Sequence, residues 1–235
     1  MMNIDKLSIR LETVSKYIIK DSIFADIGSD HAYLPCYAIN KGLAKAAIAG
    51  EIVDGPYQTA LQQVKEAKLE NKISVRKGDG LEVIEANEVD CITIAGMGGG
   101  LITSILEKGA ERLEGVQRLI LQPNIGAHHI RNWCVQNNWE LINEEIIEED
   151  EKIYEILVAS KIQTNESYKL TDASLLLGPF LMKEKNEAFK KKWTEELKQW
   201  KNILEKMNEA EDPDKISERK EQLKKNIMLV KEVLK

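Results

Sequence analysis

Short apolar stretches that alternate with helix-like segments constrain the fold of this chain more than any other feature. Five such stretches occur in its first half, and each is followed by an acidic residue, a glycine or the segment Gln-Pro-Asn. Strands joined through helices form an open parallel sheet, because the crossover connections are right-handed. We therefore predict an α/β fold, a Rossmann-like, doubly wound sheet with helices on both faces. The predicted strands are residues 23–26, 46–51, 73–76, 89–95 and 118–121.

A predicted hairpin ends this series. Residues 139–148 and 152–160 have strand-like composition, and the acidic turn Glu149-Asp150-Glu151 separates them. Two strands joined by so short a turn are antiparallel. We expect this hairpin at an edge of the sheet, which makes the sheet mostly rather than wholly parallel.

The character of the chain changes in its last third. Residues 186–210 and 215–234 are charged and have helical spacing, and Asp212-Pro213 interrupts them. This pattern predicts an antiparallel, coiled-coil-like helix pair with an apolar seam. We expect a Rossmann-like catalytic domain over residues 1–163 and a helical domain over residues 164–235.

Composition disfavours several kinds of protein. No stretch of about 18 apolar residues is present, so no membrane span is expected. The N-terminal segment is amphipathic and interrupted by charges rather than signal-like. Cys36, Cys91 and Cys134 lie far apart and show no zinc-site spacing with histidine, so we expect free thiols in a cytoplasmic protein without a metal. The net charge of −6 gives no general support for nucleic-acid binding, although the tail is mildly basic.

The carboxyl ends of the predicted strands are the expected ligand site, because open α/β sheets bind ligands at this edge. Asp26 and Gly28 follow the first strand, Glu51 ends the second, and Asp79 follows the third. Glu51 lies 23 residues after Gly28, about the interval at which an acid meets the hydroxyl groups of a ribose. Asp79 could accept a hydrogen bond from an adenine amino group. Alternatives stay open: Asp26 could cap the next helix, Glu51 could be an exposed strand end, and Asp79 could serve only the turn.

The first of these turns contains a single glycine, and the dinucleotide motif G-x-G-x-x-G is absent. A ligand with ribose and adenine but no pyrophosphate fits this turn better, which favours S-adenosylmethionine over NAD. The segment Gly96-Met97-Gly98-Gly99-Gly100 lacks the Lys-Ser/Thr pair of a phosphate-binding loop, so hydrolysis of a nucleoside triphosphate is disfavoured. We expect it to be a loop that lets backbone approach the methionine part of the cofactor or the substrate; the alternative is a merely flexible loop.

Five motifs, DIGSDHAYLP, GEIVDGP, KGDGLEVI, IAGMGGGLI and LQPN, occur in this order. With them the chain resembles the bacterial tRNA (adenine-22, N1)-methyltransferases over residues 3–160, and its tail is similar in helical-hairpin character. The resemblance implies transfer of a methyl group from S-adenosylmethionine to N1 of adenine 22 in tRNA. The cofactor-binding residues expected on these motifs are Asp26, Gly28, Ser29, His31, Glu51, Ile52, Asp79, Gly80, Ala95, Gly96 and Met97.

The implied reaction needs no strong base, because the neutral N1 atom already has a lone pair and positioning can supply much of the acceleration. Adenine becomes cationic as N1 gains the methyl group, so acceptors that face its amino group stabilise the transition state. We expect Asn124 and the backbone carbonyls around Pro123 to be these acceptors, within the segment Gln122-Pro123-Asn124; the alternative is a strand-ending turn. Tyr33 could stack on or hydrogen-bond the extruded base, and His31 could orient the cofactor or the loop, unless both only pack at a helix start.

Residues outside the pocket are expected to contact tRNA mainly through its phosphates. Lys190-Lys191-Lys192 could touch phosphate or form a solvated face. His128-His129 with Arg131 could meet the tRNA backbone or simply begin a surface helix. Trp193 and Trp200 lie seven residues apart, and we expect them to pack in the helical seam rather than to stack on bases.

The expected partner is tRNA, bound by a monomer without a membrane or a metal. One alternative is the same cofactor used on a small-molecule or protein acceptor. Another is a non-catalytic RNA-binding protein with a vestigial cofactor pocket. Intact acids at the strand ends favour the enzyme over this second alternative.

Overall fold

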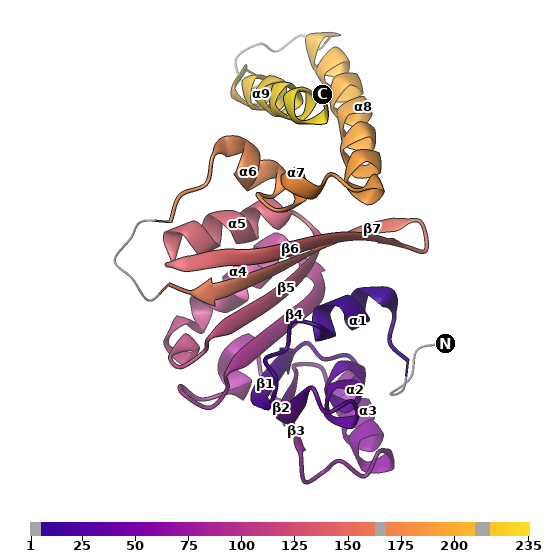
Figure 1. Cartoon of the computed structure of the whole chain (residues 1–235), viewed down its shortest axis with the longest axis vertical. Helices are drawn as coiled ribbons and strands as arrows, with labels where there is room; N and C mark the ends of the chain where they lie inside the picture. The colour runs from indigo at the N-terminus through magenta and orange to yellow at the C-terminus, as the bar shows by residue number, and fades with distance from the viewer. Residues whose placement is uncertain (1–5, 163–167, 210–216) are drawn as a thin grey trace.

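The computed structural model describes residues 6–162, 168–209 and 217–235 (Figure 1). Its centre is a seven-stranded sheet in the order β3-β2-β1-β4-β5-β7-β6. Strands β1 to β5 are parallel, and the β6–β7 hairpin joins antiparallel to β5. The predicted Rossmann-like, mostly parallel sheet with a terminal hairpin is confirmed. The strands are β1 (Ser22–Ile27), β2 (Ala44–Glu51), β3 (Ile73–Lys77), β4 (Cys91–Gly98), β5 (Arg118–Ile125), β6 (Trp139–Glu149) and β7 (Lys152–Lys161).

The strand order reverses between β1 and β4. From β1 the chain runs outward through β2 to β3, and then crosses back to β4 on the other side of β1. Open sheets bind ligands at the carboxyl ends of the two strands that flank such a reversal. The fold therefore directs attention to the end of β1, near Asp26, and to the end of β4, near Gly96.

Helices cover both faces of this sheet (Figure 1). One buried cluster joins the strands to α1 (Ile9–Ser15), α2 (Tyr33–Asn40) and α3 (Asp54–Glu66). The opposite cluster joins them to α4 (Gly99–Lys108) and α5 (Ala127–Gln136). The central strands are thus buried on both sides, which explains why they read as nearly continuous apolar runs.

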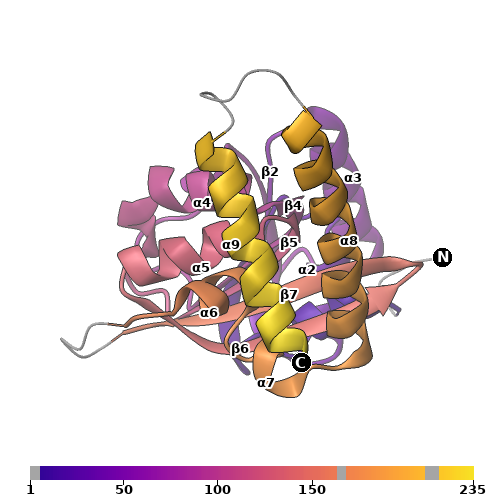
Figure 2. The same ribbon diagram turned by 90° about the horizontal axis from the view of Figure 1, so that it is seen from above.

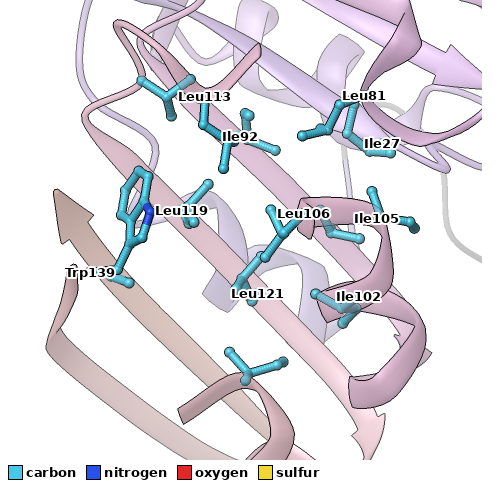
Figure 3. Packing of buried hydrophobic residues seen from close by; sticks show 14 of the residues in the cluster. Ile27, Leu81, Ile92, Ile102, Ile105, Leu106, Leu113, Leu119, Leu121 and Trp139 are labelled. Carbon is cyan, nitrogen blue, oxygen red and sulfur yellow. The ribbon is translucent and has the colours of Figure 1, made fainter. Parts of the chain in front are cut away.

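Strand β5 shows how one apolar run serves both faces. Leu119 and Leu121 enter the cluster beneath α4 and α5, whereas Ile120 between them enters the cluster on the other face. Figure 3 shows Leu121 close to Leu106 and Ile102 of α4. This alternation has the period of two residues that a strand imposes on its side chains.

Two of the predicted strand ends are wrong. Strand β4 continues through the first glycines, and α4 begins directly at Gly99, so the expected glycine loop is not present. Strand β5 continues through Gln122, Pro123 and Asn124, so this segment is not a strand-ending turn. Met97 pairs with Pro123, and the register is irregular on both sides of Met97. An irregular register accommodates proline, which has no N–H to give to the ladder.

Gly99→Ala is expected to destabilise the fold by roughly 1–3 kcal/mol, the usual cost of overpacking. A Cβ at Gly99 would overlap the carbonyl oxygen of Gly126, where α4 and α5 begin. The matched control is Gly100→Ala in the same helical turn, where a Cβ meets nothing within 4 Å. That change is expected to be neutral or stabilising, because alanine favours helix. Urea unfolding measures both; equal stability of the two variants would contradict the packing argument.

The described part of the chain beyond residue 168 is helical. None of the helices among the described residues is long and apolar enough to cross a membrane. Figure 2 shows the last two helices side by side, as predicted for an antiparallel pair. The helices are α6 (Asp172–Leu177), α7 (Leu181–Glu184), α8 (Glu187–Glu209) and α9 (Ser217–Leu234).

The apolar seam of this helix pair also contacts the sheet. Trp193 of α8 and Val230 of α9 share a buried cluster with Ile146 of β6. The rings of Trp193 and Trp200 lie 6.0 Å apart, so the expected packing of these tryptophans in the seam is confirmed. The expected domains, residues 1–163 and 164–235, thus share an apolar contact at β6, and the division itself stays a prediction.

A buried ionic cluster fastens the helical part to the sheet. Arg131 of α5 is 0% exposed, and its guanidinium donates to Glu144 of β6 at 2.7 Å and to Glu155 of β7 at 2.5 Å. Lys192 of α8 donates to the other oxygen of Glu155. The prediction that Arg131 meets the tRNA backbone is wrong, because these partners enclose it.

The carboxylates of this cluster differ in their titration. Burial raises the pKa of Glu144, against the opposing effect of Arg131. Burial also acts to raise the pKa of Glu155, but Lys192 and Arg131 outweigh it and lower that pKa. The backbone N–H of Phe180 donates to Glu144 at 3.0 Å. Both carboxylates therefore depend on donors from α5 and from the helical part.

Candidate cofactor and adenine site

Asp26 ends the central strand β1 as a buried carboxylate. Its two oxygens accept hydrogen bonds from the hydroxyls of Ser29 and Thr93, both at 2.6 Å. Asp26 therefore ties the following turn to strand β4. It does not cap the next helix, because the N-cap residue of α2 is Ala32, without a side-chain bond. The capping alternative for Asp26 is wrong.

The turn after β1 is strained. Asp30, His31 and Ala32 have φ values of 42°, 70° and 56°, a region that side-chain-bearing residues rarely adopt. Each such residue costs roughly 1–3 kcal/mol, and surrounding contacts must hold it in place. Glu51 supplies one of these contacts, because its carboxylate accepts a hydrogen bond from the backbone N–H of Asp30. Glu51 is only 6% exposed, so the alternative of an exposed strand end is wrong.

Asp26 and Glu51, the two acids at this edge of the sheet, are both buried and poorly solvated. Burial raises the pKa of Asp26, although its hydroxyl donors and Arg10 act in the opposite direction. Burial likewise raises the pKa of Glu51, although the N–H of Asp30 lowers it. Carboxyl groups with raised pKa values at the open edge of a sheet are typical of functional sites.

Asp26→Asn is expected to raise the free energy of unfolding at neutral pH. Because the folded-state pKa of Asp26 lies above its ordinary value of 3.8, the ionised form costs stability at higher pH. That cost shrinks as the pH falls through the folded-state pKa, and it is absent below 3.8. Asparagine keeps the shape and can still pair with Ser29 and Thr93. Unfolding curves over a descending pH series measure the difference; an Asn variant less stable than the parent at neutral pH would refute this reasoning.

A cavity of about 330 Å³ lies between the ends of β1 and β4. Gly28 has a φ of 69°, which favours glycine, and a Cβ there would displace the Cε atom of the flexible Met97 side chain. The cavity offers one buried carboxylate, backbone groups, the Met97 thioether and the Arg10 guanidinium, which is bound to Gln122; this set fits an adenosyl compound. The predicted residues that line it are Asp26, Gly28, Ser29, Ala95, Gly96, Met97 and Asn124.

Five predicted cofactor residues lie outside this lining: His31, Glu51, Ile52, Asp79 and Gly80. Glu51 holds the turn from behind, and Ile52 follows it with 57% of its surface exposed. Asp79 and Gly80 line a separate cavity of about 120 Å³. Asp79 begins a short 3₁₀ helix, η1 (Gly80–Val83), in a capping box with Glu82. The structure thus gives Asp79 a turn role, and its contact with adenine stays a prediction.

His31 and Tyr33 lie together beside the strained turn. Their rings are 5.6 Å apart, and the Nε2 atom of His31 is 3.2 Å from the Asp30 carboxylate. The Nδ1 atom of His31 is buried without a hydrogen-bond partner among the described residues. Tyr33 is half-buried and packs against the core beneath α2. Neither residue lines the cavity, and their roles toward cofactor and base stay predictions.

The Gln122-Pro123-Asn124 segment lies directly beside strand β4, and its Asn124 lines the cavity. The Oε1 atom of Gln122 accepts the backbone N–H of Gly96 at 2.9 Å. The side-chain amide of Asn124 donates to the carbonyl of Gly96 at 2.7 Å. These two bonds clamp Gly96 from both sides. They also fix the Asn124 amide at the exposed edge of the cavity. Its oxygen accepts a long hydrogen bond of 3.5 Å from the Gln122 amide, which leaves it capacity for a second donor.

Five lining residues were not predicted, and two of them, Arg10 and Tyr154, contact each other. The guanidinium of Arg10 donates to Gln122 Oε1 at 2.5 Å and lies 5.4 Å above the Tyr154 ring. Arg10 belongs to α1, whose first N–H groups are bound by the carboxylate of Glu149, at 2.5 Å for Ile9. Glu149 is 140 residues away at the tip of the hairpin. No local pattern in the sequence signals so distant a pairing.

The other candidate RNA contacts are also engaged within the chain. Lys190 pairs with Glu187 on its own helix, whereas Lys191 and Lys192 reach Glu148 and Glu155 of the hairpin. The alternative that these three lysines form a solvated face is therefore wrong for Lys192, because its side chain is partly buried and paired with Glu155.

The two histidines at the start of α5 differ. His128 is half-buried, and burial lowers its pKa, with further lowering by His129 and Arg131. His129 is exposed. Contact of either ring with the tRNA backbone stays a prediction.

Comparisons with known proteins agree with this geometry. The family model described as tRNA (adenine(22)-N(1))-methyltransferase matches residues 24–232. The Bacillus subtilis protein of that name is 52% identical over 235 residues, covering 99% of both chains. The crystal structure of the B. subtilis M1A22 tRNA methyltransferase has a TM-score of 0.93 and 51% identity, covering 98% of this chain and 100% of that one.

A solved structure with bound cofactor adds to this. The Streptococcus pneumoniae putative tRNA (m1A22) methyltransferase in complex with S-adenosyl-L-methionine has a TM-score of 0.87 and 40% identity. It covers 98% of this chain and 100% of that one. The resemblance noted from the five motifs is confirmed: the chain belongs to the tRNA (adenine(22)-N(1))-methyltransferase family.

Proposed function

We propose that this chain transfers a methyl group from S-adenosylmethionine to N1 of adenine 22 in tRNA. The observation that carries the proposal is the cavity at the ends of β1 and β4, with Asn124 fixed at its edge by Gly96. It occurs in a chain similar over its whole length to a tRNA (adenine(22)-N(1))-methyltransferase. The solved complex of the S. pneumoniae relative supports the choice of cofactor.

The residues of this edge fit an adenosyl cofactor. The Gly28–Ser29 backbone and Met97 border the space for it, and Asp26 holds the turn from below. One oxygen of Glu51 is committed to the Asp30 N–H, and the other would receive the ribose hydroxyls. Ile52 offers an exposed apolar surface to the adenine ring. When bound, S-adenosylmethionine supplies an electrophilic methyl group on a sulfonium sulfur.

Asn124 is the residue to which we assign the largest catalytic effect. As N1 of the target adenine accepts the methyl group, positive charge moves onto the purine and its amino group becomes a stronger donor. The Asn124 oxygen and the carbonyls near Pro123 would accept these protons and stabilise that charge. Arg10 and Gln122 keep the acceptor in place through Gly96. Tyr33 would stack on the base once it leaves the tRNA helix.

The helical part is expected to contribute phosphate contacts, which make binding salt-sensitive. Deleting it is a poor test, because the deletion would strip Trp193 from its cluster with Ile146 and Lys192 from Glu155. Loss of tRNA binding would then report a damaged fold. Charge-neutralising changes at exposed lysines of α8, such as Lys198→Gln, keep the fold and test the same idea.

We further infer a monomer that acts in the cytoplasm. Cys36, Cys91 and Cys134 are buried free thiols, as a reducing compartment favours.

Primer extension on tRNA after incubation with the protein and S-adenosylmethionine tests the proposal. An N1-methyl group blocks base pairing, so reverse transcription is expected to stop at adenine 22. A transcript with guanine at that position is the control and should give no stop. A stop elsewhere would overturn the assigned position. Labelled methyl recovered only in protein or small molecules would favour the alternative acceptor, and tight tRNA binding without turnover would favour the non-catalytic reading.

A further inference from the structure

A second large cavity of the described structure lies between the sheet and the helix pair, away from the cofactor pocket. Its volume is about 550 Å³, within the range of sites for small organic groups. The first turn of α5, together with α6, α8 and α9, forms its walls. Figure 2 shows α8 and α9 lying side by side, with α5 and α6 next to α9. We call this space the interdomain groove.

Acids outnumber lysines around the interdomain groove. Lys192 is bound to Glu155, and Lys225 is bound to Asp172 at 2.5 Å. Glu196 adds a further carboxylate to the wall. A phosphate would meet two neutralised lysines and an acid, so the walls do not suit an anion. They suit a neutral polar group.

Rings and amides supply the remaining wall. Trp200 contributes partly exposed aromatic surface, whereas Trp193 is only 3% exposed and its buried indole N–H has no partner among the described residues. The Gln222 amide donates to the Asn226 oxygen at 2.9 Å. This bond leaves the Asn226 N–H₂ group and the Gln222 oxygen as a neighbouring donor and acceptor. Aromatic surface beside a donor and an acceptor is the chemistry that recognises a nucleobase.

A third cavity, of about 240 Å³, connects the interdomain groove to the catalytic edge. It shares Asn124 with the cofactor pocket, and it shares Gly126, Lys192 and Glu196 with the interdomain groove. Ile125, which is 77% exposed, lies between these two ends. The wall of this third cavity also carries Glu151, Glu195 and Glu196. A nucleic-acid strand with one base at Asn124 would therefore continue into the groove with its phosphates turned toward solvent.

We propose that the interdomain groove binds a second unpaired base of the same tRNA, near the target adenine in the folded RNA. The inference rests on the proposed function, because it requires tRNA as the substrate. Extruding one base unstacks its neighbours, and a second site that holds such a neighbour offsets part of that cost. The groove would then contribute to tRNA affinity without touching the reacting atoms.

A thermodynamic cycle tests the groove. Asn226→Ala is combined with tRNA transcripts that each lack one unpaired base, with the target adenine always kept. Equilibrium binding is measured by filter retention in the presence of S-adenosylhomocysteine. We expect Asn226→Ala to weaken binding of intact tRNA about tenfold, the scale of one well-made recognition contact. One abasic position should weaken binding by a similar factor, and the two losses should not add.

The controls separate folding, location and function. Asn202→Ala changes an exposed amide of α8 outside the three cavities and should bind every transcript as the parent does. Gln222→Ala, at an exposed position, repeats the test if Asn226→Ala unfolds. Additive losses at every position would overturn the groove inference, and so would a change of oligomeric state caused by Asn226→Ala. Methylation of intact tRNA by the parent, measured in parallel, decides the proposed function separately.

Discussion

Asn124→Ala is expected to slow methyl transfer to tRNA by about 100-fold or more, the effect of removing one preorganised group that stabilises transition-state charge. The substituted side chain cannot accept the amino protons of the adenine as it becomes cationic. The bond to the Gly96 carbonyl is lost as well, but Gly96 keeps the bond from its N–H to Gln122. Binding of S-adenosylmethionine should therefore remain close to that of the parent.

Single-turnover kinetics with excess enzyme isolates this chemical step from product release. Calorimetry with S-adenosylmethionine checks that the pocket is intact. Asn124→Asp keeps an acceptor but cannot donate to Gly96, so its rate should lie between those of the parent and the alanine variant. Asn202→Ala is the control for a surface amide. A near-normal rate for Asn124→Ala would remove Asn124 from the mechanism.

Arg131→Met should produce the largest loss of stability, about 3–5 kcal/mol, as when one partner of a buried ion pair is removed. The side chain of Arg131 is fully buried, and it binds Glu144 and Glu155 at 2.7 and 2.5 Å. Without it, Glu144 keeps only the N–H of Phe180 and Glu155 keeps Lys192. Glu144 and Glu155 would then remain buried without the guanidinium that compensates their negative charge.

Urea unfolding measures this loss, with Arg219→Met as the control for the same change at an exposed site. The control should stay within about 0.5 kcal/mol of the parent. Adding Glu144→Gln to Arg131→Met should recover part of the stability, because it removes one unpaired charge. A loss below about 1 kcal/mol for Arg131→Met would show that water or rearrangement compensates the carboxylates.

The parallel sheet could be predicted because its signals are local. Apolar runs, a glycine after Asp26 and an acid at Glu51 follow from strands buried on both faces and a turn at the ligand edge. The ends of β4 and β5 could not be predicted in the same way. Glycines and Pro123 usually interrupt strands, but these two strands extend together with an irregular register. Neighbouring strands therefore overrode the preferences of single residues.

Arg131 and Arg10 show a second limit of the sequence. Arg131 stands beside two histidines at a helix start, which indicated an exposed cationic patch. Its partners Glu144 and Glu155 come from a hairpin whose position against α5 no local pattern reveals. Arg10 reaches the cofactor pocket only because Glu149 binds the start of α1. Contacts between distant segments decided the role of both arginines.

The fastening of the helix pair by Lys192 and Arg131 has a consequence for choosing among RNAs. An appendage anchored through buried charge cannot swing freely to follow its target. The far end of the helix pair would stay at a fixed distance from the reacting adenine. An RNA whose arms are longer or shorter could not contact the helix pair and place its adenine at the catalytic site at the same time. The enzyme would therefore discriminate against such RNAs by their shape, independently of base sequence.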